Sequence, residues 1–149
     1  MNPESKFILL VEDNPQDEAL TIRALKKNGV TNEITVARDG EEALDFLFCR
    51  GMHAGRDSKI QPQVVLLDLK LPKIDGIQVL KEIRANEKTK FLPVIILTTS
   101  SEDKDVISGY KSGANAYVKK PVDFKEFSEA VKTLGLFWLL LNLTPNSLR

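Results

Sequence analysis

Several residue types and patterns are scarce in this chain of 149 residues, and each scarcity excludes a class of protein. A single cysteine, Cys49, excludes a disulfide framework and a cysteine-based metal cluster, and a single histidine, His53, leaves few ligands for a softer metal ion. The longest apolar run, Leu136 to Leu141, has six residues, whereas a membrane-spanning helix needs about 20. Acidic and basic residues balance at 21 each, which gives no sign of nucleic acid or membrane partners. We therefore expect a soluble, cytoplasmic globular protein.

What the chain does contain is an alternation of short apolar runs and helical patterns. The apolar runs, which predict buried strands, lie at residues 7–11, 34–37, 64–67, 93–97 and 116–118. Helix starts are expected at Asn14-Pro15, at Asp39, at Asp75-Gly76, at Ser100 or Ser101, and at Asp123. This alternation predicts a doubly wound α/β fold with a five-stranded parallel sheet in the flavodoxin-like strand order 2-1-3-4-5.

Polar side chains directly follow four of the expected strands. They are Glu12 and Asp13 after the first strand, Asp68 after the third, Thr98 after the fourth and Lys120 after the fifth. Because parallel strands end at one edge of the sheet and the first and third strands are neighbours, the three carboxylates should converge. A single ammonium group cannot balance three close carboxylates, so a divalent cation is expected. Oxygen ligands favour Mg²⁺, with Mn²⁺ as an alternative ion.

The same residues suggest a reaction. A carboxylate beside a divalent cation and a lysine is suited to attack a phosphoryl group, and Asp68 is the candidate nucleophile. Lys120 and the Thr98 hydroxyl would hold the charge of the transferred group together with the metal. Each residue alone has a plainer explanation: Asp68 can cap a loop, Thr98 favours a strand, and Lys120 can be solvated. The combination at four strand ends favours the functional interpretation.

Four separated motifs resemble the receiver domain of two-component response regulators. They are VED at Val11–Asp13, LLDLKLPKIDG at Leu66–Gly76, PVIILTT at Pro93–Thr99 and GANAYVKKP at Gly113–Pro121. The resemblance covers about residues 6–135, with the motifs in the family's order and approximate spacing. It implies a signalling protein that is not an enzyme beyond self-phosphorylation and slow autodephosphorylation.

The resemblance also implies a role for each site residue. Asp68 would accept a phosphoryl group from a histidine kinase. Mg²⁺ would be held by Glu12, Asp13, Asp68 and the backbone carbonyl of Lys70. Thr98, Thr99, Lys120 and Tyr117 would bind the phosphoryl group or act as switch residues, and the Lys120–Pro121 bond would be cis. Phosphorylation would then draw Thr98 towards Asp68, let Tyr117 turn, and change the surface formed by the fourth helix, fifth strand and fifth helix.

Two residues beside the expected phosphoryl site depart from the family's pattern. Lys70, two residues after Asp68, is a cation where close relatives commonly carry a neutral amide. Ser100, two residues after Thr98, is a small hydroxyl. We predict that Lys70 alters the lifetime of the aspartyl phosphate, although a lysine that points into solvent is an equally valid interpretation.

The tail, residues 136–149, is too apolar for a solvated helix end. It can pack on its own domain or form a homodimer contact, for which the candidates are Phe137, Trp138 and Leu141. The tail, the long loop after the second helix and the LTTSS segment resemble single-domain regulators that pair with phytochrome-type histidine kinases and form homodimers. Here Leu140, Leu141 and Asn142 depart from that pattern. We expect residues 1–149 to form a single receiver domain with its core at about 6–135 and no output domain.

Three other functions fit the sequence less well. An aspartate-nucleophile phosphatase of the haloacid dehalogenase type wants a second acid two residues after the nucleophile, where Lys70 stands. A flavodoxin needs a hydroxyl- and glycine-rich phosphate loop after the first strand, where this chain has the acidic segment 12–17. A receiver used only as a dimerisation scaffold would leave the complete set of phosphorylation residues without a use.

Overall fold

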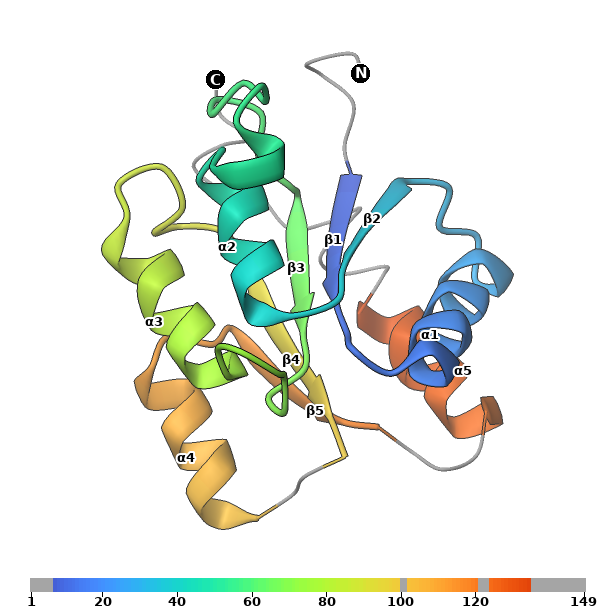
Figure 1. The fold of residues 1–149 in the computed structure, drawn as a ribbon. Coiled ribbons are helices and arrows are strands. Elements are labelled where there is room, and N and C mark those ends of the chain that lie inside the picture. The colour runs from blue at the N-terminus through green and yellow to red at the C-terminus, as the bar shows by residue number, and fades with distance from the viewer. Residues whose placement is uncertain (1–6, 100–101, 121–123, 135–149) are drawn as a thin grey trace.

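The computed structural model describes residues 7–99, 102–120 and 124–134 of the chain (Figure 1). Strands and helices alternate along it, as the sequence predicts. The strands are β1 (Phe7–Val11), β2 (Glu33–Ala37), β3 (Val64–Leu67), β4 (Val94–Thr98) and β5 (Ala116–Lys119). The helices are α1 (Pro15–Lys27), α2 (Gly40–Leu47), α3 (Gly76–Ala85), α4 (Asp103–Lys111) and α5 (Phe124–Leu134), with a short 3₁₀ turn, η1, at Gly51–His53.

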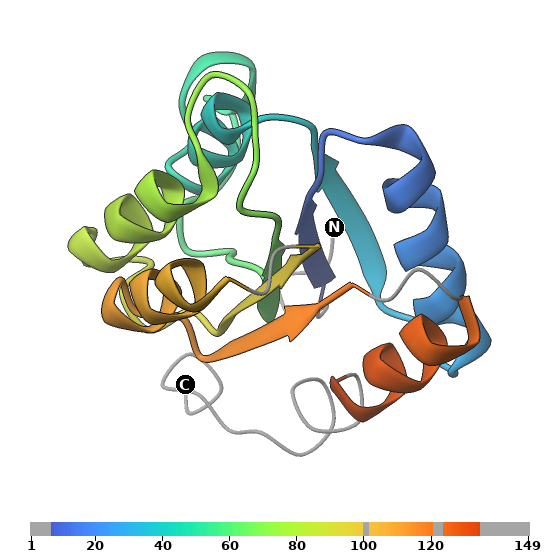
Figure 2. The same ribbon diagram turned by 90° about the horizontal axis from the view of Figure 1, so that it is seen from below.

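The five strands form one parallel sheet in the order β2-β1-β3-β4-β5. Helices α2, α3 and α4 cover one face of the sheet, and α1 and α5 cover the other (Figures 1 and 2). The predicted fold class and strand order are therefore confirmed. This order makes β1 and β3 neighbours at the centre, which is where doubly wound sheets place their ligands.

The apolar runs form strands because both faces of the central strands are covered. Every residue of β1 and β3 is buried. Alternate side chains enter different cores: Leu9 packs into the core on the α2 and α3 side, whereas Ile8 and Leu10 pack with Leu25 of α1. Burying each such side chain contributes about 1.5–3 kcal/mol. The central sheet is thus a rigid support for the residues at its edge.

Three of the predicted helix starts are confirmed by their capping hydrogen bonds. The side chain of Asn14 accepts from the backbone of Gln16 and Asp17, Asp39 accepts from the backbone N–H of Glu42, and Asp75 accepts from that of Gln78. The N-cap of α4 is Glu102, so the predicted helix start at Ser100 or Ser101 was wrong by at least one residue. The predicted cap of α5, Asp123, lies outside the described residues.

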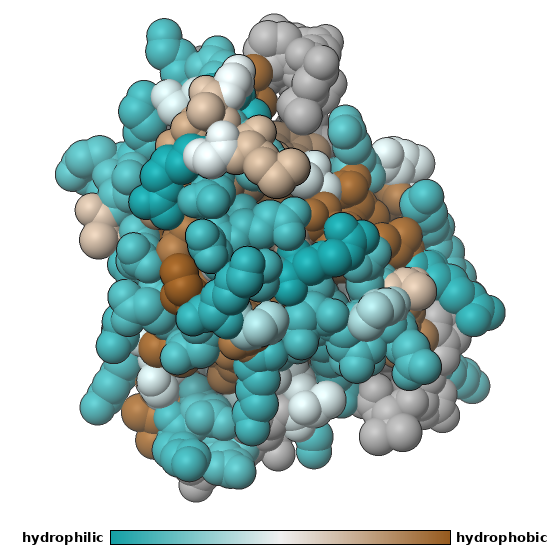
Figure 3. Space-filling view, viewed as in Figure 1, coloured by the Kyte–Doolittle hydropathy of each residue, from teal (hydrophilic) through white to brown (hydrophobic). Residues whose placement is uncertain are grey.

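The surface is largely hydrophilic on the face seen in Figure 3, where hydrophobic side chains form separate patches. The apolar residues of the sheet are accordingly covered by the helices. Within the part of the chain that the structure describes, no helix combines the length and the hydrophobicity that crossing a membrane requires.

Candidate phosphoryl and metal site

The site lies where β1, β3 and β5 end. Val11 and Leu67 pair in the register of β1 and β3, so Glu12 and Asp68, the residues that follow them, begin at the same level of the sheet. The backbone N–H of Asp68 donates to the Val11 carbonyl at 3.1 Å, which fixes the start of the loop. The backbone N–H of Lys120 donates to the carbonyl of Thr98 at 2.7 Å and fixes the lysine to the end of β4 in the same way.

The structure brings together the three predicted carboxylates. Glu12, Asp13 and Asp68 each offer an oxygen, and these oxygens lie within 4.8 Å of one another. Glu12 is buried, Asp68 is partly buried and Asp13 is exposed, so the cluster opens to solvent on the side of Asp13. Hard carboxylate oxygens with access to water fit a magnesium or manganese ion, which keeps several water ligands. The residues present therefore fit the divalent metal that the sequence predicts.

Lys120 is the cation of the site, and it is shared by three carboxylates. Its side chain is 5% exposed. The ammonium donates to Glu12 Oε1, to Asp68 Oδ2 at 3.2 Å and to Asp17 Oδ2 at 3.2 Å. One positive charge therefore lies among four acids, because Asp13 belongs to the same cluster.

This excess of negative charge changes the proton affinity of the buried groups. The pKa of Glu12 is raised to about 7, mainly because burial disfavours its charged form; the hydrogen bond from Lys120 and the charge of that lysine lower the pKa, and Asp68 raises it. For Lys120, burial alone would lower the pKa, but the hydrogen bond to Glu12 and the charges of Asp68, Glu12 and Asp17 outweigh it and raise the pKa. Lys120 therefore stays charged at neutral pH, and the surplus negative charge is relieved at Glu12 by a proton or by a metal ion.

Asp17 contacts Lys120 but is not among the site residues predicted from the sequence; it lies in the first turn of α1. The position of Asp17 in the sequence nevertheless indicates that it lies near the site. Asp17 is three residues after the cap Asn14, and α1 begins immediately after β1 at the edge where Glu12 lies. A side chain on that first turn is close enough to reach the end of β5, although it is 103 residues from Lys120 in the chain.

The loop after β3 is held against the start of α3. The backbone N–H of Lys70 donates to Asp68 Oδ1 at 3.2 Å, and that of Gly76 donates to the carbonyl of Leu69 at 2.8 Å. A Cβ at Gly76 would lie 2.3 Å from the backbone oxygen of Asp68. Only glycine therefore allows this approach, and α3 fixes the backbone that carries Asp68.

The other predicted residues lie around this centre. Thr98 is buried at the end of β4, and Thr99 is exposed. Tyr117 is partly buried against the core below α4, where a Cβ at Gly109 would meet its ring at 3.3 Å. The predicted cis bond at Lys120–Pro121 and the tail contacts fall outside the described residues. Those tail residues are Phe137, Trp138 and Leu141.

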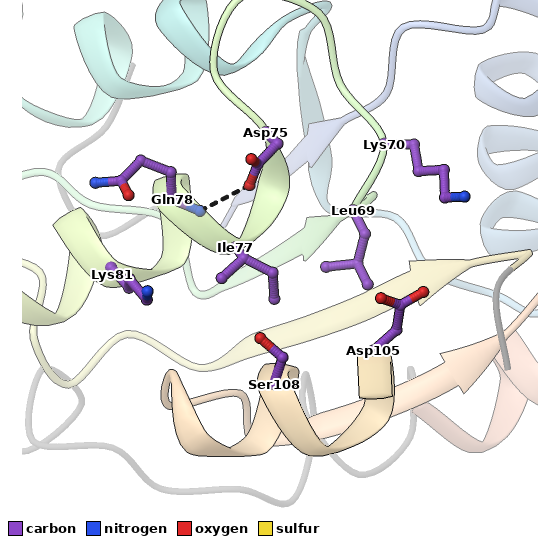
Figure 4. A pocket seen from close by; sticks show the side chains of 8 residues that line it. All are labelled: Leu69, Lys70, Asp75, Ile77, Gln78, Lys81, Asp105 and Ser108. Carbon is purple, nitrogen blue, oxygen red and sulfur yellow. Dashed lines mark hydrogen bonds between the residues drawn. The ribbon is translucent and has the colours of Figure 1, made fainter. Parts of the chain in front are cut away.

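A groove of about 360 Å³ lies beside the site, between the loop after β3 and the facing sides of α3 and α4 (Figure 4). Leu69 and Ile77 line one part of it, and Asp105 and Ser108 of α4 face them. Lys70 also lines the groove, and its side chain is exposed. Glu12, Asp13 and Asp68 are not among the groove's lining residues, so the groove flanks the carboxylate cluster and is separate from it.

Comparison with known sequences places the chain in a family. The response regulator receiver domain matches residues 8–132. A probable methanogenesis regulatory protein, FilR2, of Methanothrix harundinacea is 41% identical over 93% of this chain and 87% of its own length. The response regulator Rcp1 of Synechocystis sp. is 40% identical over 90% of this chain and 89% of its own.

Solved structures give the same result. The phosphorylated cyanobacterial phytochrome response regulator RcpA superposes with a TM-score of 0.87 at 37% identity, covering 95% of this chain and 99% of that one. The Mn²⁺-bound form of Rcp1 has a TM-score of 0.85 at 38% identity, covering 94% and 99%. The bacteriophytochrome response regulator AtBRR is 49% identical, with a TM-score of 0.72 and coverage of 95% and 100%. The chain belongs to the response regulator receiver domain family and is related to the phytochrome response regulators.

Proposed function

We propose that this protein is a signalling switch in which Asp68 accepts a phosphoryl group from a histidine kinase in a Mg²⁺-dependent reaction. One observation carries the proposal. The Asp68 carboxylate lies in a cluster with Glu12 and Asp13 within 4.8 Å, and the ammonium of Lys120 is 3.2 Å from its Oδ2. A nucleophile, a metal site and a fixed cation therefore meet at one point.

The geometry supports a direct displacement. A carboxylate oxygen of Asp68 attacks phosphorus, the new O–P bond forms as the P–N bond to the kinase histidine breaks, and the imidazole leaves with the electron pair. Lys120 is positioned to pair with an oxygen of the transferred group, and the Thr98 hydroxyl donates to another. Glu12, Asp13, Asp68 and the backbone carbonyl of Lys70 would hold the metal. When bound, Mg²⁺ supplies positive charge against the phosphoryl oxygens.

The readout of the switch would be the surface of α4, β5 and α5. Thr98 lies on β4 beside β5, and Tyr117 pairs with Ile96 in the register of those strands. A shift of Thr98 towards a phosphoryl group on Asp68 would free space for the Tyr117 ring to turn beneath α4. Ile107 and Tyr110 expose 54% and 51% of their surface on that helix, which suits contact with a partner protein.

We propose a phytochrome-type histidine kinase as the phosphodonor because of the likeness to phytochrome response regulators. The receiver would occupy about residues 6–135, work in the cytoplasm, lose its phosphoryl group slowly by autodephosphorylation, and form a homodimer through the apolar tail. Phosphotransfer profiling against a panel of histidine kinases tests the donor, and a kinase without a phytochrome module as the preferred donor would refute the phytochrome link. Light scattering with and without phosphodonor tests the dimer, and a monomer at all concentrations would refute it.

Radiolabelled acetyl phosphate tests the phosphoacceptor itself. We expect Mg²⁺-dependent label on the wild type, no label after addition of EDTA, and no label on Asp68→Asn. Asp57→Asn makes the same chemical change in the exposed loop after η1 and should label as the wild type does. Label on Asp68→Asn equal to that of the wild type would refute the assignment.

A further inference from the structure

We propose that Asp17 is a positioning residue for Lys120, holding its ammonium in the pocket when a divalent cation takes over the other carboxylates. The inference rests on the proposed phosphoacceptor function of Asp68 and assigns a role to a residue outside the metal cluster.

The contacts of Lys120 divide into two kinds. Two of its partners, Glu12 and Asp68, also belong to the cluster that fits a metal. A bound cation attracts these two carboxylates and repels the ammonium, so both contacts weaken together. Asp17 lies outside that cluster and contacts Lys120 Nζ at 3.2 Å. Its contact is therefore the one of the three that metal binding does not compete for directly.

The first turn of α1 directs the Asp17 carboxylate towards Lys120. The backbone N–H of Asp17 donates to Asn14 Oδ1 at 3.1 Å, so the residue stands at the third position of the helix. In a capping box, an acid at this position returns to the backbone N–H of the cap residue. Here the N–H of Asn14 instead contacts Glu12 Oε2 at 3.4 Å, and the carboxylate of Asp17 reaches Lys120.

The flexible part of Lys120 is what this contact would control. Its backbone is already fixed by the hydrogen bond to Thr98 on β4. The side chain has several rotatable bonds, so its ammonium can leave the pocket unless a counter-charge retains it. With Asp17 in place, the ammonium stays beside Asp68, where an incoming phosphoryl group would need it.

Three variants of the 149-residue chain test this role. Asp17→Asn removes the charge at nearly constant volume, Asp17→Glu restores it, and Glu18→Gln is a control on the same turn that contacts Arg38. At saturating Mg²⁺ we expect Asp17→Asn to slow phosphorylation by acetyl phosphate about tenfold, the effect of losing one hydrogen bond between charged groups. Asp17→Glu should recover most of the rate, and Glu18→Gln should match the wild type.

Two further readouts separate positioning from a structural or metal-binding role. The affinity for Mn²⁺ alone, measured by electron paramagnetic resonance, should stay within twofold of the wild type in Asp17→Asn. Acetylation of Lys120 by N-hydroxysuccinimide acetate in the presence of Mg²⁺, read by peptide mass spectrometry, should rise severalfold in that variant, because the ammonium is no longer retained.

The outcomes that would overturn the inference are distinct. Wild-type rates and wild-type Lys120 acetylation in Asp17→Asn would refute it. A tenfold loss of Mn²⁺ affinity would place Asp17 in the metal site and refute the positioning role. Persistent labelling of Asp68→Asn would refute the proposed function first, and with it the role of Asp17.

Discussion

Glu12 is almost completely buried, and we expect its raised pKa to make the stability of the metal-free protein fall with rising pH. Burial and the charge of Asp68 raise the pKa of Glu12 from 4.5 to about 7, whereas in the unfolded chain the carboxyl returns to its ordinary value. Between these two values the folded state binds more protons than the unfolded state. The contribution of Glu12 to the free energy of unfolding should therefore be largest below pH 4.5 and should fall as the pH rises towards 7.

The size of the effect follows from the same two values. Each pH unit between them changes the free energy of unfolding by up to about 1.4 kcal/mol, so the loss from pH 4.5 to pH 7 is about 3 kcal/mol. Urea unfolding followed by circular dichroism at pH 5, 6, 7 and 8, with EDTA present, measures it. Glu12→Gln removes the titrating group, so the difference between wild type and Glu12→Gln isolates this contribution. Glu41→Gln, at an exposed position, should keep the wild-type profile.

Mg²⁺ should reverse the trend because it replaces the proton on the carboxylates. Metal binding favours the ionised form of Glu12, so the stabilisation by Mg²⁺ should be larger at pH 8 than at pH 6. The reasoning fails if, in EDTA, the free energy of unfolding of the wild type stays level or rises from pH 5 to pH 7 relative to that of Glu12→Gln.

Three further substitutions test the support of the site. Gly76→Ala should lower the free energy of unfolding by about 1–3 kcal/mol, because the added Cβ would lie 2.3 Å from the backbone oxygen of Asp68. The control Gly55→Ala, where the added Cβ has open space, should leave stability unchanged, and urea unfolding of both variants measures the difference. Arg84→Gln should lower the free energy of unfolding by about 2–3 kcal/mol, because it removes hydrogen bonds from the guanidinium to the carbonyls of Gly113, Leu92 and Lys90 and to Asn115. The control Arg38→Gln, at an exposed ion pair, should lower it by less than about 1 kcal/mol. Lys70→Ala should change the lifetime of the aspartyl phosphate, measured as loss of label after removal of the phosphodonor, and decay at the wild-type rate would refute a role for Lys70.

The fold could be predicted because its signals are local. A strand covered on both faces must be apolar throughout, so Phe7–Val11 and Val64–Leu67 are visible as continuous runs. Helix starts carry side chains that accept from the first turn, as Asn14, Asp39 and Asp75 do. The fourth helix was placed less well because several consecutive polar residues could each serve as its cap, and tertiary packing decides among them.

In the candidate site, only the residues that directly follow a strand could be predicted from the sequence. Glu12, Asp13 and Asp68 follow strands that pair directly, so strand order alone brings them together. Side-chain contacts between distant elements have no such rule. The Arg84 contacts to the turn before β5 are one example, and the stacking of Arg56 on the Phe46 ring at 3.7 Å, which anchors the long loop after η1, is another.

The charge balance of the pocket connects its stability to its function. One ammonium, that of Lys120, lies among four acids, so the metal-free pocket is short of positive charge, and the pKa of Glu12 is raised to about 7. A phosphoryl group on Asp68 would add further negative charge, so the phosphorylated state depends on metal and on Lys120 more than the resting state does. A site with a perfectly balanced resting charge would bind the cation weakly and respond little to phosphorylation. The excess negative charge of Glu12, Asp13 and Asp68 would thus favour binding of the ion, whereas Asp17, outside that cluster, would keep the single ammonium where the phosphoryl group must arrive.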